Sequence, residues 1–440
     1  MNGLPRPRIS WAGLIAVLLF TGCVFQEVRT QQAKLERFCK IDGSVSAEQQ
    51  TPSPLLVGLV RHTGGALDDP KNWSLVDHFV LESPGRWMFR TDAGTYGLVA
   101  FKDVNADGVY QPGEPFLPID RDRLVTCADG HGHTEAVLLI PTEGRSRLEG
   151  DIDFMNFQAR SASDQLEHSL GTATAYGVVT TLNDPRFKDE QGGGSLWRPY
   201  DFIIDVGPGV YFLEPYDARK IPVLFVHGIN GTPTNFRYLV EHLDRTKYQP
   251  WLYYYPSGVR LSGLADHLDQ TMKTLQLEHG FTQYHLIAHS MGGLVSRGFL
   301  LRNQSGESRA RIPLYITIST PWAGHKAAEA GVDYAPAVVY VWNDMVPQSA
   351  YLSDLFFNRV GGEPVHRPLP TGVQHHLLFG FKHRGGGECS DGTVTLASQL
   401  YSGAQADASR LYGFDETHMS ILDSSETSRL VNRLLDDASP

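Results

Sequence analysis

The chain has 440 residues, of which 41% are hydrophobic and 20% charged, an ordinary balance for a globular protein. This length exceeds what one compact domain usually needs, so two domains are expected. The formal net charge is −11 and the chain contains no basic run. Such an acidic chain is not expected to bind nucleic acid, or to attach to anionic lipid by charge alone.

Residues 1–22 differ from the rest of the chain. Two arginines precede an apolar run from Trp11 to Phe20, which is too short to span a bilayer comfortably and predicts a secretory signal. The run ends in Phe-Thr-Gly-Cys, which resembles the lipobox of bacterial lipoproteins, with phenylalanine in place of the usual leucine. The resemblance implies a lipid on Cys23 and attachment to the membrane of the bacterial cell envelope. Ordinary signal cleavage and an uncleaved anchor are the alternatives.

Residues 40–145 are predicted to form a small β-sandwich domain. Short strand-like runs at residues 55–60, 87–89, 96–101 and 136–140 are separated by turns. In an exported protein Cys39 and Cys127 could form a disulfide within this domain, and the sequence leaves their pairing open. Cys389 would then be a free thiol.

A segment of this domain, residues 103–114, matches the calcium-loop pattern D-x-[DN]-x-[DN]-G-x₅-E at every required position. Its candidate ligands are Asp103, Asn105, Asp107, Val109, Gln111 and Glu114. A strand leads in, and Pro112 and Gly113 forbid the exiting helix of an EF-hand. The segment resembles turns in β-sandwich repeats of bacterial surface proteins, some of which bind calcium. A structural calcium and a turn held by its own side chains are equal alternatives.

Residues 146–205 are interpreted as a connecting region. The stretch 160–170 is polar, and the glycine run at 191–194 predicts a mobile loop. Residues 206–440 then alternate strand and helix patterns, beginning with a strand at 206–213. This alternation predicts an α/β domain with a mostly parallel sheet covered by helices on both faces.

The α/β domain begins with a strong strand signal. The apolar run from Pro222 to Val226 predicts a buried parallel strand, and it ends in the loop His-Gly-Ile-Asn-Gly at residues 227–231. Further strands are predicted at residues 250–255 and 314–319. The apolar residues from 264 to 277 lie roughly on one helical face.

The most informative motif is Ala-His-Ser-Met-Gly-Gly at residues 288–293. It stands between a strand pattern at 284–287 and a helix pattern. Small residues two places before and two places after Ser290 allow the tight turn of a nucleophile elbow, which exposes the serine hydroxyl above the sheet edge. The N–H of Met291, at the helix start, would point toward an oxyanion formed there.

Residues 326–372 form a long segment without strand rhythm. Its aromatic residues are Tyr334, Tyr340, Trp342, Tyr351, Phe356 and Phe357. Long inserts in compact domains tend to be lids or binding loops, so the segment is predicted to be a lid. A cap helix packed on the core is an equal alternative, and the two do not exclude each other.

Two further motifs lie near the C-terminus. A strand-like run at 376–381 and a glycine-rich loop at 385–387 precede Cys-Ser-Asp-Gly-Thr-Val, which contains Asp391. His418 comes later, before a final amphipathic helix. Serine is a weak nucleophile without an adjacent base, so a histidine is required. The order serine, acid, histidine is that of α/β hydrolases and not that of chymotrypsin-like or subtilisin-like enzymes.

With Thr-Pro-x-x-Gly at residues 320–324, these motifs resemble the α/β-hydrolase superfamily, and within it the lipases. The resemblance covers roughly residues 212–435, about half the chain. The site residues that it implies are the nucleophile Ser290, the acid Asp391, the base His418 and the oxyanion-hole residues Ile229 and Met291. His227 is expected to be structural. The carboxylates that compete with Asp391 are Asp344, Asp354 and Asp415.

The resemblance implies a serine ester hydrolase, a lipase or carboxylesterase, that needs no cofactor for catalysis. The expected substrates are esters or lipids with hydrophobic acyl groups. Amide hydrolysis, acyl transfer, or lipid deacylation similar to that of GPI inositol deacylases could use the same triad. Outside enzymes, the alternative is a surface adhesion or scaffold protein with a retained hydrolase fold. The natural ester and the oligomeric state stay open.

Overall fold

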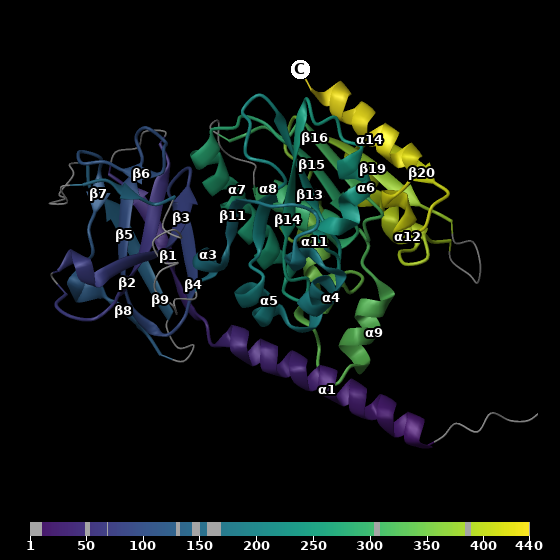
Figure 1. The fold of residues 1–440 in the computed structure, drawn as a ribbon, viewed down its shortest axis with the longest axis horizontal. Helices are drawn as coiled ribbons and strands as arrows, with labels where there is room; N and C mark the ends of the chain where they lie inside the picture. Colours follow the sequence, from purple (N-terminus) through teal and green to yellow (C-terminus); the bar gives the residue numbers. More distant parts are fainter. Residues whose placement is uncertain are drawn as a thin grey trace, which may run out of the picture.

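The structure, a computed structural model, describes residues 11–48, 53–67, 69–128, 133–142, 150–155, 169–302, 309–382 and 389–439. An N-terminal β-rich domain lies beside a larger α/β domain, and the long helix α1 (Trp11–Glu36) precedes both (Figure 1). The predicted glycine-rich loop at 385–387 and most of the polar stretch at 160–170 lie outside the described residues.

The prediction of an N-terminal β-rich domain ahead of the α/β domain is confirmed. Its strands are β1 (Cys39–Ala47), β2 (Leu55–His62), β3 (Trp73–Leu81), β4 (Gly85–Thr91), β5 (Gly94–Lys102), β6 (Val109–Tyr110), β7 (Phe116–Leu117), β8 (Val125–Cys127) and β9 (His133–Ile140). One sheet has the order β4-β1-β9 and the other β3-β2-β5-β7, with β8 pairing β5. Buried side chains from both sheets, such as Ile41, Trp87, Val57 and Leu98, form one core between them.

Cys39 and Cys127 lie in this core as buried free thiols. Burial raises the pKa of Cys127, and a hydrogen bond to the neighbouring Cys39 thiol adds to the effect. The fold therefore brings together the two cysteines whose pairing the sequence left open.

The α/β domain is built on an eight-stranded sheet with the order β11-β12-β14-β13-β15-β16-β19-β20. Its strands are β11 (Ala175–Val179), β12 (Gly209–Phe212), β13 (Ile221–Val226), β14 (Tyr248–Tyr254), β15 (His285–His289), β16 (Leu314–Ile318), β19 (Gln374–Gly380) and β20 (Ala408–Phe414). All neighbouring strands are parallel except β12 and β14. The predicted mostly parallel sheet is confirmed.

Helices cover both faces of this sheet, and its central strands β13, β15 and β16 are buried at almost every position. Alternate residues of β13 enter two different cores, Leu224 with Val226 in one and Val223 with Phe225 in the other. The first core includes α7 (Leu261–His279) and α8 (Met291–Arg302), and the second includes α6 (Arg237–Glu241) and α14 (Ser425–Ala438).

The connecting region differs from its prediction in two ways. It contributes β11 to the main sheet, with α3 (Leu170–Ala173) before it, and α5 (Pro199–Asp205) near its end. The glycine run predicted to be a mobile loop lies in helix α4 (Asp189–Trp197). Glycine disfavours helix by about 1 kcal/mol per residue, and tertiary packing overrides that preference. Here the buried Ser195 and Leu196 supply the packing.

The predicted lid at 326–372 contains three short helices and a hairpin. These elements are α9 (Lys326–Tyr334), α10 (Tyr340–Met345), α11 (Ala350–Phe356), β17 (Phe357–Val360) and β18 (Glu363–His366). The expectation that this segment has no strands is therefore wrong. Gly361 and Gly362 connect β17 and β18 with φ values of 61° and 92°. Two such residues permit the tight turn that a hairpin needs.

The second half of α1 packs against the α/β domain. Val28 is buried in the core that contains α7 and α8, and Phe25 meets Trp197 of α4 edge to face. Gln32 Nε2 donates to Val338 O at 2.8 Å, in the segment between α9 and α10. Figure 1 shows α1 running along the edge of the domain at α4, α5 and α9. Among the helices in the described part of the chain, none combines the length and apolar character needed to cross a membrane.

The two domains contact each other directly through β3 and α7. His78 Nε2 and Thr274 Oγ1 are hydrogen-bonded at 3.0 Å, and the Val80 N–H donates to Gln270 Oε1 at 3.1 Å. Beyond the end of β3, Glu82 forms an ion pair with Arg309. These polar contacts, together with Leu277 of α7 packed against an apolar cluster of the β-rich domain, dock the two domains on each other.

Six histidines make folding stability dependent on pH. Burial lowers the pKa of His78, His227, His267 and His285 to about 4, and of His289 and His375 to about 3. In an unfolded chain these imidazoles take up protons near their ordinary pKa of about 6.5. Between that pH and about 4 the unfolded state binds more protons, so the free energy of unfolding falls as the pH falls.

We therefore expect the melting temperature to be highest above about pH 6.5 and to drop steeply toward pH 4, which calorimetry at several pH values would measure. Asp77 acts in the opposite direction, because burial raises its pKa to about 7. Burial also raises the pKa of Asp103 and Glu278, and the six imidazoles outnumber these three carboxyls. His267→Gln should flatten the dependence. A melting temperature that does not change from pH 6.5 to 4 would contradict the prediction.

Candidate active site

The predicted catalytic motifs gather at one edge of the main sheet. The carboxyl ends of its parallel strands are Val226 of β13, His289 of β15, Ile318 of β16 and Gly380 of β19. The loop 227–231, Ser290, the 320–324 motif and Asp391 all follow these ends. Ligand sites of open α/β sheets lie at this edge.

Ser290 occupies a strained turn between β15 and α8. Its φ of 54° lies in the left-handed region, where a residue with a side chain is rarely found. Its N–H donates to Ile318 O at 2.8 Å. A Cβ on Gly292 would lie 2.5 Å from His227 O, so only glycine fits there. These features are those of the nucleophile elbow predicted from the motif.

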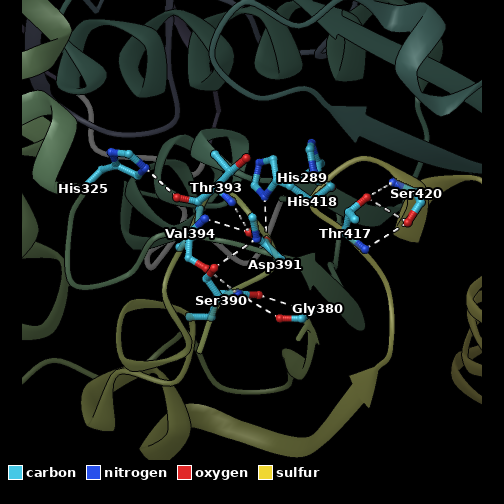
Figure 2. A network of polar contacts seen from close by, with 12 residues as sticks. His289, His325, Gly380, Ser390, Asp391, Thr393, Val394, Thr417, His418 and Ser420 are labelled. Carbon is cyan, nitrogen blue, oxygen red and sulfur yellow. Dashed lines mark hydrogen bonds and ion pairs between the residues drawn. The ribbon is translucent and has the colours of Figure 1, made fainter. Parts of the chain in front are cut away.

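Asp391 and His418 form a buried pair. His418 Nδ1 lies 2.7 Å from Asp391 Oδ2, and the His418 N–H donates to Asp391 O at 2.9 Å. The other carboxylate oxygen accepts the N–H groups of Thr393 and Val394 at 2.9 and 2.7 Å. Figure 2 shows Asp391 at the centre of this network. The structure thus brings together two residues 27 positions apart in sequence.

The electrostatics of the site keep Asp391 charged. Burial opposes its negative charge, but the hydrogen bond and charge of His418, with the N–H groups of Val394 and Thr393, outweigh that effect. The pKa of the Asp391 carboxyl therefore lies below its ordinary value. An ionised carboxylate at this position can accept a hydrogen bond from the Nδ1–H of His418 and so fix the imidazole tautomer.

His289 connects the elbow to the histidine loop. Its Nε2 lies 2.9 Å from His418 O, and the two imidazole rings are 4.6 Å apart. Burial lowers the pKa of His289 to about 3, so this ring is neutral and its Nε2–H can donate. Because His289 ends β15 and directly precedes Ser290, the contact holds this end of β15 against the loop of His418. Sequence reasoning overlooked His289, although its position inside the motif was available as a signal.

The two predicted oxyanion-hole residues flank Ser290. A Cβ on Gly228 would lie 2.7 Å from the Ser290 Cβ, so the loop that carries Ile229 contacts Ser290. Within the described part of the chain, no acceptor pairs with the Ile229 N–H. Met291 is the first residue of α8, and the first N–H groups of a helix have no intrahelical partner.

His227 packs inside the domain. Its ring stacks on Tyr255 with centroids 4.1 Å apart, its Nδ1 bonds Gly228 O at 2.8 Å, and Tyr255 OH donates to its carbonyl oxygen. These contacts fit the structural role expected for it.

The competing carboxylates are separated from His418 or exposed. Asp344 accepts the Leu261 N–H at the start of α7 at 2.8 Å and pairs with Arg260 at 2.7 Å. Asp354 and Asp415 are exposed. Of the four candidates, the structure joins only Asp391 to His418.

The segment predicted to bind calcium is a turn closed by internal hydrogen bonds. Asp103 accepts the N–H groups of Asp107 and Gly108 at 3.2 and 2.8 Å, and Glu114 accepts those of Val104 and Gln111 at 2.7 and 3.0 Å. No cluster of three or more His, Cys, Asp or Glu side chains suited to a metal occurs among the described residues. Asn105 and Gln111 side chains both donate to Asp107.

Calcium binding to this turn stays a prediction. If the ion binds the native state, it stabilises the protein by mass action and raises the melting temperature. Catalysis should respond little, because the turn lies in the other domain. Thermal unfolding with calcium and with a chelator tests this prediction. Identical melting curves would mean that the turn binds no calcium and is held by its own hydrogen bonds.

Two further cysteines were singled out in the sequence. Cys23, the predicted lipidation site, lies on α1 and is exposed, and Cys389 is exposed beside the Asp391 loop. Both are free thiols. Lipidation of Cys23 stays a prediction.

Comparison with known proteins places the fold of the α/β domain. Residues 221–381 match a family model described as the alpha/beta hydrolase fold. The matched stretch includes Ser290, Ile229 and Met291 and ends before Asp391 and His418. No curated protein matches the chain.

Solved structures of low sequence identity resemble about half of the chain. A Bacillus licheniformis lipase, BlEst2 in its mature form, has 19% identity and a TM-score of 0.41, with 51% of this chain and 97% of that chain covered. Aspergillus fumigatus lipase B has 15% identity and a TM-score of 0.39, with coverage of 52% and 56%. A Listeria innocua gene product has 12% identity and a TM-score of 0.39, with coverage of 50% and 96%.

The family match and the strand order of the sheet agree on the fold. The chain carries an α/β-hydrolase fold with a mixed, mostly parallel sheet, and an N-terminal β-rich domain precedes it. This is the fold class predicted from the sequence, and it is confirmed.

Proposed function

We propose that the protein is a serine ester hydrolase of the lipase or carboxylesterase type. In this proposal Ser290 is the nucleophile, His418 the general base, and Asp391 the carboxylate that orients it. The N–H groups of Ile229 and Met291 bind the oxyanion. The catalytic steps need no cofactor.

One observation carries the proposal. His418 is held on one side by the buried Asp391 carboxylate at 2.7 Å, and its backbone is held by His289, the residue before Ser290. Because Nδ1 faces Asp391, Nε2 is the nitrogen available to accept the Ser290 proton. This is the geometric logic of a serine triad.

The reaction follows from these roles. Ser290 Oγ attacks the ester carbonyl carbon while its proton moves to His418 Nε2, and the carbonyl oxygen becomes an oxyanion bound by the two N–H groups. The tetrahedral intermediate then expels the alcohol, which takes the proton from His418, and an acyl group remains on Ser290. Water, deprotonated by His418, releases the acid by the same route.

Covalent labelling tests the proposal most directly. A fluorophosphonate should phosphonylate Ser290, which peptide mass spectrometry would locate. Labelling should disappear in Ser290→Ala. Heat-denatured protein is the control for nonspecific reaction, and a native protein that resists labelling would contradict the proposal.

The site is also proposed to prefer hydrophobic esters. Apolar side chains flank the polar groups, with Met419 47% exposed beside His418 and Ile229 partly buried against the apolar core. A lipid on Cys23, if present, would hold the enzyme at a bilayer where such esters occur. The membrane, through that anchor, is then a partner of the protein.

We expect kcat/KM to rise from butyrate to octanoate esters of p-nitrophenol, because each buried methylene contributes about 0.8 kcal/mol. Steady-state kinetics across the series measures this. A continuous fall beyond the butyrate would indicate a short-chain carboxylesterase with a closed pocket.

A further inference from the structure

Helix α4 packs directly against the loop that carries Ile229. A Cβ on Gly192 would lie 2.6 Å from Thr232 Cγ2, 2.7 Å from Asn230 O and 2.9 Å from Gly231 O. These distances are too short for any side chain unless the loop moves. The backbone of α4 therefore touches the residues that follow Ile229.

A pair of buried serines links the same helix to the same loop. The Ser195 hydroxyl of α4 donates to Gly192 O at 2.6 Å, and its oxygen lies 3.0 Å from Ser257 Oγ. Ser257 Oγ in turn accepts the Asn230 N–H at 3.2 Å. Both serine residues are completely buried.

The direction of these hydrogen bonds follows from the number of protons. Ser195 has one hydroxyl proton, which it gives to Gly192 O, so Ser257 must donate in the bond between the two hydroxyls. The lone pairs of Ser257 are then free for the Asn230 N–H. Each hydroxyl proton is therefore used once, and the hydrogen bonds connect α4 through Ser257 to Asn230, the residue after Ile229.

A third contact, between α4 and Gly258, fixes the position of the helix. The Gly258 N–H donates to Ser195 O at 3.2 Å, and a Cβ on Gly258 would overlap Leu196 O. Asn230 itself has a φ of 57°, a conformation that persists in a residue with a side chain only when its surroundings hold it. The contacts of Asn230 with Ser257 and Gly192 stabilise this backbone conformation.

We propose that α4 positions the oxyanion hole, with Gly192, Ser195 and Ser257 as positioning residues that set the place of the Ile229 N–H. The inference rests on the proposed function and adds to it the element that aligns one of its two oxyanion donors. None of the three residues touches the substrate. They act through the backbone of residues 228–231.

Small displacements of this loop should have large kinetic effects. Removal of one oxyanion donor typically costs about 10²- to 10³-fold in rate. A misplacement of about 1 Å can cost about 10²-fold. The effect should fall on kcat, because the oxyanion exists in the transition state and not in the bound ester.

Adjacent glycines of α4 provide a matched test. Gly192→Ala places a methyl group against the loop, whereas nothing lies within 4 Å of a Cβ on Gly193. Both changes add the same group to the same helix. We expect Gly193→Ala to keep the wild-type kcat, and Gly192→Ala to lower it about 10- to 100-fold with little change in KM.

Ser257→Ala tests the hydrogen bond without adding bulk. It should lower kcat by a similar factor and weaken binding of an alkyl boronic acid, whose tetrahedral anion uses the oxyanion hole, in the same proportion. Substrate KM should stay constant. If Ser257 had only a structural role, Ser257→Ala would lower the melting temperature, and the ratio of boronate affinity to substrate KM would not change.

The outcomes separate this inference from the proposed function. If wild-type protein neither reacts with fluorophosphonate nor cleaves esters, the proposed function is wrong and the inference falls with it. If wild-type protein is active and Gly192→Ala equals Gly193→Ala in kcat and boronate affinity, only the inference is overturned. Equal boronate affinity for Ser257→Ala and wild type would overturn it as well.

Discussion

Ser290→Ala is expected to lower kcat for ester hydrolysis by about 10⁵- to 10⁶-fold, the size of effect seen when a serine nucleophile is removed from a triad. Without the Ser290 hydroxyl the proposed acyl-enzyme cannot form. Residual hydrolysis by water can still use the oxyanion donors. Kinetics with a p-nitrophenyl ester and fluorophosphonate labelling measure the loss.

The fold should survive this substitution. Ser290 is almost completely buried, and the bond that holds its backbone runs from its N–H to Ile318 O, which alanine preserves. Circular dichroism and the melting temperature serve as controls. Wild-type turnover by a correctly folded Ser290→Ala protein would contradict the serine mechanism.

Asp391→Asn is expected to lower kcat by about 10⁴-fold, as the loss of the triad carboxylate does elsewhere. One carboxylate oxygen accepts the N–H groups of Thr393 and Val394. The amide oxygen of asparagine should take that place, which leaves its NH₂ group facing His418 Nδ1. Nδ1 must then accept a hydrogen bond, the proton moves to Nε2, and Nε2 can no longer take the Ser290 proton.

Two substitutions provide controls for this prediction. Asp344→Asn weakens the contacts with Leu261 and Arg260 at the start of α7, so it should lower the melting temperature more than kcat. Asp415→Asn changes an exposed residue and should alter neither. A 10⁴-fold loss in either control, with Asp391→Asn active, would assign the acid to another residue.

The elbow was predictable because its requirements are local. A turn that lifts a serine out of a sheet needs small residues two places away on each side, and Ala288 and Gly292 meet that need within five residues. The strand before it was equally visible, because Leu286, Ile287 and Ala288 form the kind of apolar run that a strand buried on both faces needs. The position of Ser290 in the fold followed from these two signals.

The assignment of the acid needed more than local signals. Asp391, Asp344 and Asp415 all lie after Ser290 and before His418 in the chain, so order alone could not choose among them. The resemblance to lipases favoured Asp391. The three-dimensional structure supplies the physical discrimination, since only Asp391 of these carboxylates bonds His418.

The glycine run of α4 shows where local reasoning fails. Consecutive glycines are unfavourable in a helix, so residues 191–194 were predicted to be a loop. The helix forms because Ser195 and Leu196 at its far end are buried, and Gly192 has room in it only because glycine lacks a side chain that would meet residues 230–232. The reason for that glycine lies in Thr232 and Asn230, about forty positions away, and no window of sequence contains both.

By itself, the sequence determined the strand–elbow–helix around Ser290, the alternation that makes a mostly parallel sheet, and the β-rich character of residues 40–145. Each of these follows from the preferences of neighbouring residues for turns and for burial. Only the tertiary structure decided the contacts of His289 with His418 and of α4 with the loop 228–231. These contacts join segments that are distant in the chain, and the packing of the whole sheet sets the distance between them.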